Sequence, residues 1–87
     1  MEKTEAPKTR EEILQMSLDA RVQEVMHYQI NIDNYTIALN DIGKLSQEEQ
    51  AELSEFSSQL RGLLSSEKLE QKKAKIMLEV VRKQVKV

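Results

Sequence analysis

The sequence contains no cysteine and few aromatic residues, prolines or glycines, and each of these shortages excludes a class of protein. Without cysteine there can be no disulfide framework, no thiolate nucleophile and no cysteine-ligated zinc. Two tyrosines, one phenylalanine, two glycines and one proline are too few for a turn-rich β fold. No run of about 18 apolar residues occurs, so we expect no membrane-spanning helix.

The charge of the chain is high and unevenly distributed. Charged residues make up 32% of the 87 residues, which favours long helices, and the net charge is −2. Residues 1–67 carry six basic and thirteen acidic residues, whereas residues 68–87 carry seven basic and two acidic residues. An acidic body with a basic end can pair with another copy of itself or with an anionic partner.

Apolar residues recur at helical spacing over residues 10–42 and predict one long helix. Thr9 and Glu12 have the spacing of a capping box at its start. The residues of the main stripe are Leu14, Leu18, Val25, Tyr28, Ile32, Tyr35, Leu39 and Ile42. This stripe drifts by about 20° per heptad, as in a left-handed supercoil. A second stripe of Met26, Ile30 and Ile37 predicts a second neighbour for the same helix.

A second helix is predicted over residues 47–64, after a turn over residues 43–46. We expect Gly43 to cap the first helix by adopting a positive φ, and Ser46 with Glu49 to form a second capping box. So short a turn predicts an antiparallel hairpin. The residues that the second helix is expected to bury are Leu53, Phe56, Leu60, Leu63 and Leu64.

The helical pattern is weakest over residues 62–66, where two alternatives stay open. Either Ser65 or Ser66 caps a third C-terminal helix over residues 66–85, or the second helix continues through a kink. We predict an all-α fold, namely a long antiparallel helical hairpin with coiled-coil-like packing and, in the first alternative, that third helix. The hairpin would form a single domain over residues 9–87, preceded by a flexible tail over residues 1–8.

Glu24 and His27 are the candidate metal ligands. Their Glu-x-x-His spacing occurs in di-iron helical bundles, but a monomer has only one such motif, and the pattern favours an exposed or partner-facing histidine. No glycine-rich phosphate loop or catalytic triad is recognisable, so we expect no enzymatic activity and no cofactor.

A polar run in the first helix also has two interpretations. Its members are Gln29, Asn31, Asp33, Asn34 and Asn40. They form either a solvent-exposed face or a hydrogen-bonding face that fixes partner and register. Tyr28 and Tyr35 lie beside the main stripe, either at the edge of the core or as binding hot spots.

The basic residues of the C-terminal segment are candidates for nucleic-acid binding. They are Lys68, Lys72, Lys73, Lys75, Arg82, Lys83 and Lys86. The acidic chain as a whole and the absence of aromatic residues from residues 68–87 argue against this function, because there is nothing to stack on bases. The favoured interpretation is a solvent-exposed face whose positive charges stabilise the C-terminal end of the helix. Binding to a membrane surface is a further alternative.

The sequence best fits a small non-enzymatic protein-protein interaction module, such as an adaptor, a regulator or an assembly factor in the cytoplasm. The chain has more apolar helix surface than one thin hairpin can hide, and a second copy, in a homodimer, is the expected cover. The residues expected to bind the partner are Met26, Tyr28, Ile30, Tyr35, Ile37, Met77, Val81 and Val85. A nucleic-acid-associated regulator and a metal-binding helical bundle are the alternatives.

Overall fold

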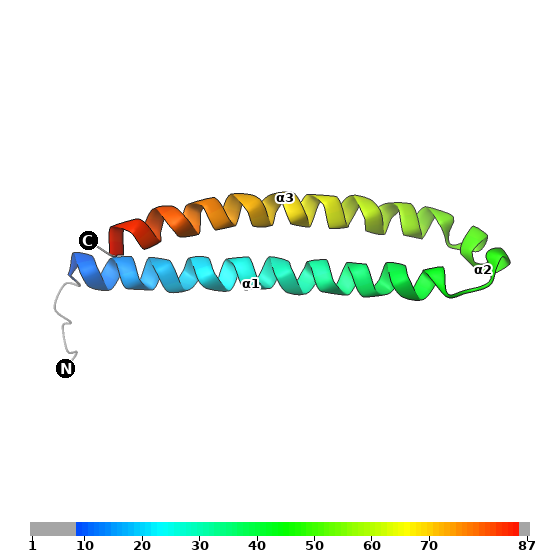
Figure 1. Cartoon of the computed structure of the whole chain (residues 1–87), viewed down its shortest axis with the longest axis horizontal. Helices are drawn as coiled ribbons and strands as arrows, with labels where there is room; N and C mark the ends of the chain where they lie inside the picture. Colours follow the sequence, from blue (N-terminus) through cyan, green and yellow to red (C-terminus); the bar gives the residue numbers. More distant parts are fainter. Residues whose placement is uncertain (1–8, 86–87) are drawn as a thin grey trace, which may run out of the picture.

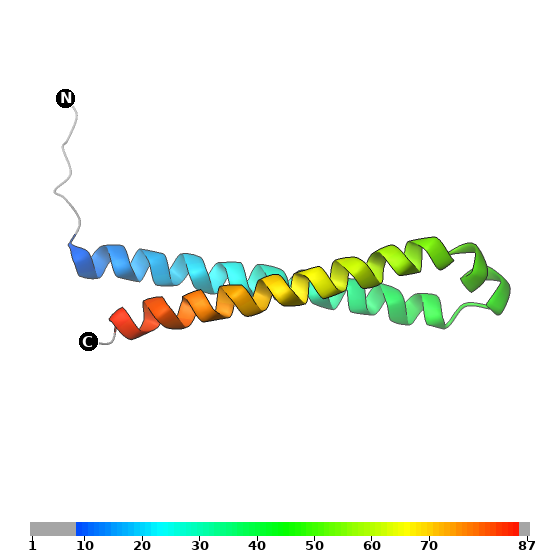
Figure 2. The same cartoon turned by 90° about the horizontal axis from the view of Figure 1, so that it is seen from above.

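The computed structural model describes residues 9–85 and shows an antiparallel hairpin of two long helices (Figure 1). Helix α1 spans Arg10–Gly43, helix α3 spans Ser54–Val85, and the short helix α2, Gln47–Glu52, lies in the connection. Figure 2 shows that α1 and α3 cross at a shallow angle. The radius of gyration is 20.1 Å, against about 12 Å for a compact domain of this length. The all-α hairpin prediction is confirmed, and the predicted tail lies outside the described residues.

Both predicted capping boxes are present. The hydroxyl oxygen of Thr9 accepts a hydrogen bond from the Glu12 amide at 3.1 Å, and the Thr9 amide donates to the Glu12 carboxylate at 2.9 Å. Ser46 and Glu49 make the same pair of bonds at the start of α2. These bonds satisfy amides that have no partner inside the helix, and they fix where α1 and α2 begin.

Gly43 does not cap α1 through a positive φ, so that prediction is wrong. No glycine in the described part of the chain has a positive φ. The cap residue is Lys44, with a φ of −90°, and its amide donates to the carbonyl oxygens of Asp41 and Ile42. A last turn that tightens in this way is open to any residue, so the conformational freedom of glycine is not needed. The side-chain amide of Gln50 donates to the Leu45 carbonyl oxygen at 2.8 Å and holds α2 against the turn.

The second helical segment is interrupted at Leu53, not over residues 62–66. Leu53 has φ −100° and ψ 13°, which ends α2, and α3 begins at the next residue. Helix α3 then runs without a break to Val85, so the predicted helices over residues 47–64 and 66–85 are replaced by α2 and one long helix. The continuous alternative holds because the residues that pack on α1 keep their seven-residue repeat through this segment, and tertiary packing outweighs weak local helix preference.

The core is one narrow seam between α1 and α3. Its buried apolar residues are Ile32, Leu60, Ala74, Leu78 and Val81, and its buried polar residues are Ser57 and Gln71. The α3 members are spaced by three, four or eleven residues, which fits the seven-residue repeat of a two-stranded coiled coil. Each helix has one long neighbour and can therefore bury only one stripe.

Phe56 and Leu63 were predicted to be buried, but each is 48% exposed. Each comes one residue before a position of the seam, Ser57 or Leu64, and so lies about 100° round the helix from it. At this point the seam contains the serine, which is buried, and the phenylalanine lies outside the seam.

Polar side chains align the two helices near the middle of the hairpin. The amide of Asn31 donates to the Glu67 carboxylate at 2.6 Å, and the amide of Gln71 donates to Oε1 of Gln29 at 2.9 Å. Two members of the predicted polar run, Gln29 and Asn31, therefore fix the register within the hairpin. The other three are exposed.

Candidate protein-protein interface

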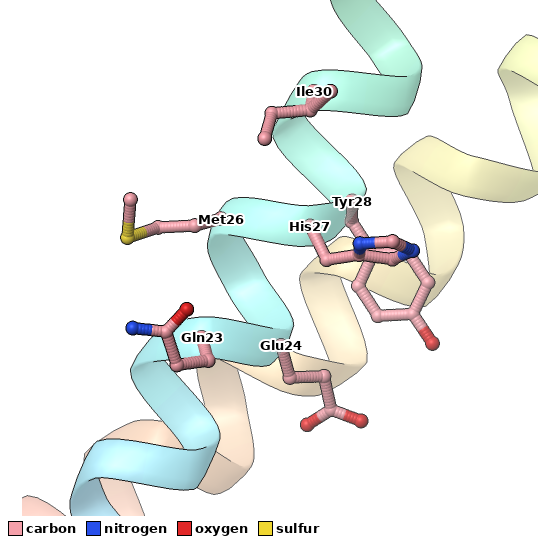
Figure 3. A pocket seen from close by; sticks show the side chains of 6 residues that line it. All are labelled: Gln23, Glu24, Met26, His27, Tyr28 and Ile30. Atoms are coloured by element: carbon pink, nitrogen blue, oxygen red, sulfur yellow. The ribbon is translucent and has the colours of Figure 1, made fainter.

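The side of α1 that faces away from α3 carries exposed apolar side chains, which we call the α1 outer face. Its members are Ile13, Met16, Met26, Ile30 and Ile37, each 52–57% exposed. Ile30 lies two residues before the buried Ile32, about 200° round the helix, and so projects away from the seam. In Figure 3, Met26 and Ile30 project away from α3, whereas Tyr28 lies on the side of α3.

Helix α3 has a corresponding set of apolar side chains, which we call the α3 outer face. Its members are Phe56, Leu63, Leu69, Ile76, Met77 and Val80, each 40–64% exposed. Ile76 is the most exposed at 64%, and it lies two residues from both Ala74 and Leu78 of the seam. The α1 outer face and the Leu69, Ile76 and Val80 part of the α3 outer face lie roughly opposite the seam, so these parts point in opposite directions across the hairpin. Phe56, Leu63 and Met77 each come one residue before a seam position and lie at the side of α3.

The hairpin exposes more large apolar side chains than it buries. Eleven large hydrophobic residues are at least 40% exposed, while five hydrophobic residues, one of them an alanine, form the buried core. Single exposed apolar side chains are ordinary on a protein surface, whereas apolar side chains that recur along one side of a helix are candidates for an interaction site.

The residues predicted to bind a partner fall into two groups. Met26, Ile30, Ile37 and Met77 lie on the outer faces, with more than a third of each side chain exposed. The others lie in or beside the hairpin seam: Tyr28, Tyr35 and Val85 are half-buried and Val81 is buried. The two tyrosines therefore follow the core-edge interpretation.

Sequence reasoning missed part of both outer faces. It left out Ile13 and Met16 of α1 and assigned Phe56 and Leu63 to the core. It also left Leu69, Ile76 and Val80 out of the partner-binding residues and included Val81, which is buried. The available signal was an offset of one or two residues from a seam position, and on α3 it is usable only once the seam is known.

An open groove on α1 surrounds the candidate metal ligands (Figure 3). The six residues that line it are Gln23, Glu24, Met26, His27, Tyr28 and Ile30. The Glu24 carboxylate lies 3.1 Å from the Arg21 guanidinium and is engaged in an ion pair. Within residues 9–85, no three histidine, cysteine, aspartate or glutamate side chains come together in a way that could hold a metal ion. The groove is a shallow apolar and polar contact surface next to the α1 outer face.

Four basic residues form a row along α3, which we call the basic row. They are Arg61, Lys68, Lys75 and Arg82, and their seven-residue spacing places them on one side of the helix. Among the described residues, Arg82 is the member of this row that forms an ion pair, and its partner is Glu79.

The remaining basic residues of the predicted nucleic-acid site do not belong to this row. Lys72, Lys73 and Lys83 lie at other positions round α3, and Lys73 is 3.0 Å from Glu70. Lys86 lies outside the described residues. Sequence reasoning missed Arg61, because the change of charge along the chain begins seven residues later.

The two long helices carry opposite net charges that are not paired across the hairpin. Helix α1 has two basic and six acidic residues, a net charge of −4, and α3 has seven basic and four acidic residues, a net charge of +3. The four ion pairs found among residues 9–85 all join residues three apart in the sequence, and none joins α1 to α3. The opposite charges of the helices are therefore available to a partner.

Comparison with known proteins does not identify the chain. No family model matches it, and no curated protein or solved structure matches it either. No helix in the described part of the chain is long and apolar enough to cross a membrane. The function must therefore be argued from the surfaces of the hairpin.

Proposed function

We propose that the protein is a non-enzymatic interaction module that associates with further copies of itself through its outer faces. The observation that carries this proposal is the α1 outer face, where Ile30 and Ile37 are more than half exposed on a helix whose opposite side is already packed. A row of this kind is stabilised by a neighbouring helix, because removing apolar surface from water is favourable by about 25 cal/mol per Å².

The strength of the association follows from the size of the faces. Completing the burial of one half-exposed aliphatic side chain contributes about 1 kcal/mol, roughly half the value for full burial. An interface that covers one outer face from each of two copies therefore gains about 10 kcal/mol. Association costs about 4–15 kcal/mol in lost translational and rotational freedom, and the ordering of interface side chains adds to this cost. We expect reversible association that depends on protein concentration.

Light scattering during size-exclusion chromatography tests the proposal. The wild type should have a mass above that of the monomer at high concentration, and Ile30→Asp/Ile37→Asp should be monomeric. The matched control is Gln15→Asp/Thr36→Asp, which adds the same two charges to exposed positions of the same helix that are neither three nor four residues from a member of the α1 outer face, and it should associate like the wild type. Equal masses for all three proteins would contradict the proposal.

A second candidate function is the binding of a nucleic acid along the basic row. The specific observation in its favour is that Arg61, Lys68 and Lys75 have no ion pair among residues 9–85. From Arg61 to Arg82 the row extends about 32 Å, a length that can follow several phosphates.

Fluorescence anisotropy with a labelled oligonucleotide tests this second candidate. Lys68→Gln/Lys75→Gln should weaken the binding and reduce its salt dependence. Lys72→Gln/Lys73→Gln removes the same charge from outside the row and should have the smaller effect. An absence of binding by the wild type even at low salt would remove the candidate.

A further inference from the structure

We infer that self-association joins unlike faces, so that the α1 outer face of one copy packs against the α3 outer face of another copy. The inference rests on the proposed function and specifies its geometry. It follows from the places of the two faces and from the charges around them.

The placement of the faces excludes a two-fold dimer that covers both. A two-fold interface pairs a patch with the same patch on the partner. Pairing α1 with α1, or α3 with α3, leaves the other outer face of each copy in water, because the α1 outer face and the Leu69, Ile76 and Val80 part of the α3 outer face point in opposite directions. When unlike faces pair, one kind of contact covers both faces of every copy that has two neighbours.

The net charges of the helices favour the packing of α1 on α3 over the packing of either helix on its own counterpart in another copy. Packing α1 on α1 brings two helices of net charge −4 together, and packing α3 on α3 brings two helices of net charge +3 together. Packing α1 on α3 brings opposite charges together. Each exposed ion pair is worth less than about 1 kcal/mol, so these charges choose the partner face while apolar burial supplies the affinity.

The charged residues that flank the apolar rows are mainly acidic on α1 and mainly basic on α3. On α1, Asp33 lies three residues after Ile30 and four before Ile37, and is therefore on the same side of the helix as both. On α3, Lys73 lies three residues before Ile76, and Lys83 lies three residues after Val80. Glu79, which pairs with Arg82, also lies three residues after Ile76, so the α3 outer face has more basic than acidic neighbours, while the α1 outer face has the acidic Asp33.

The arrangement has a consequence for the number of copies. A contact between unlike faces leaves one free face of each kind at the two ends of any chain of copies. Such a chain extends until it closes into a ring, or it continues as a filament. The assembly therefore grows beyond two copies as the concentration rises.

A complementation experiment tests the inference. Ile30→Asp/Ile37→Asp disrupts the α1 outer face, and Leu69→Lys/Ile76→Lys disrupts the α3 outer face. Each pair of substitutions keeps the sign of the charge on its helix. Sedimentation velocity should show that each variant alone is a monomer, and that an equimolar mixture forms a one-to-one dimer and nothing larger. The dimer is expected because each variant retains the face that the other has lost.

Two controls make the result interpretable. Gln15→Asp/Thr36→Asp and Ser54→Lys/Ser58→Lys add the same charges at exposed positions that are neither three nor four residues from a member of the outer faces, and they should assemble like the wild type. Circular dichroism should show the same helix content in every variant, because the substituted side chains lie outside the seam.

The remaining outcomes separate the inference from the proposed function. A dimer of the α1 variant alone would mean that α3 pairs with α3, and a dimer of the α3 variant alone would mean that α1 pairs with α1. Either result overturns the inference, and so does a monomeric mixture when the wild type associates. A wild type that is monomeric at every concentration overturns the proposed function as well.

Discussion

The side-chain amide of Gln71 on α3 donates a hydrogen bond to Oε1 of Gln29 on α1 at 2.9 Å, and it also reaches the Val25 carbonyl oxygen at 3.3 Å. Gln71 is 8% exposed, so this amide lies inside the seam. A buried polar side chain in an apolar seam lowers stability but restricts alignment, because a shifted register would leave it without partners. Gln71 therefore contributes alignment more than stability.

Replacing Gln71 with leucine should raise the free energy of unfolding by about 1–2 kcal/mol, because a buried amide is exchanged for a buried apolar group. Its main partner Gln29 is exposed and can bond to water instead. Urea unfolding of dilute protein, followed by circular dichroism, measures the change. Gln59→Leu at an exposed position of the same helix is the matched control and should change stability by less than about 0.5 kcal/mol. A fall in stability for Gln71→Leu would show that its hydrogen bonds hold the seam together.

Leu60 and Leu69 lie on the same helix but differ in exposure, at 6% and 54%. Leu60→Ala leaves a gap in the seam and should cost about 2–4 kcal/mol, enough to unfold much of a hairpin this small. Leu69→Ala should barely change the stability of the dilute protein, but it should weaken association. Thermal unfolding at a low and a high concentration distinguishes the two effects. Equal losses in dilute protein would mean that Leu69 belongs to the hairpin core.

The features predicted correctly from the sequence are those determined by neighbouring residues. A capping box needs only Thr9 and Glu12, or Ser46 and Glu49, so the starts of α1 and α2 were visible in the sequence. The seam of α1 was visible because its members are nearly all apolar. The wrong prediction at Gly43 arose because the last turn of α1 tightens without a positive φ.

The seam of α3 could not be predicted because its composition conceals it. Ser57, Glu67 and Gln71 occupy seam positions, while Phe56 and Leu63 lie next to the seam and are exposed. Which side of α3 forms the seam is determined by its packing against α1 and by the hydrogen bonds between the two helices. Neither depends on neighbouring residues in the sequence alone. The outer face of α3 depends on the same choice, and for that reason only part of the candidate interface was visible in the sequence.

Gly62 lies within α3 and has space for a side chain. Apart from its chain neighbours and the backbone of its own helix, no atom lies within 4 Å of the place that a Cβ would occupy, and its φ is not positive. Gly62→Ala should therefore raise the free energy of unfolding by about 0.5–1 kcal/mol, because alanine loses less backbone freedom on folding. Gly43→Ala at the last residue of α1 is the comparison and should give a smaller gain. Thermal unfolding of dilute protein checks both, and a destabilised Gly62→Ala would contradict the helix as described.

Glu12 gives the start of α1 a dependence on pH. Hydrogen bonds from the Thr9 backbone amide, and then from its side chain, hold the pKa of the Glu12 carboxyl below its ordinary value. A lowered pKa in the folded state means that the ionised carboxylate stabilises the cap. This contribution is complete above the ordinary pKa and is lost as the pH falls through the lowered one.

Amide resonances of the first helical turn measure this effect in an acid titration by nuclear magnetic resonance. They should show fraying of the turn as the pH falls. Glu12→Gln should remove the transition, because its side chain does not ionise. Glu11→Gln lies outside the capping box and should leave the transition in place. Persistence of the transition in Glu12→Gln would assign it to another group.

The central claim is that the outer faces of the hairpin are covered by further copies of the same chain. Sedimentation equilibrium of the wild type, from micromolar to millimolar concentration, tests this claim most directly. The measured mass of the wild type should rise with concentration from that of the monomer to that of assemblies of more than two copies. A mass equal to the monomer over the whole range would contradict the claim.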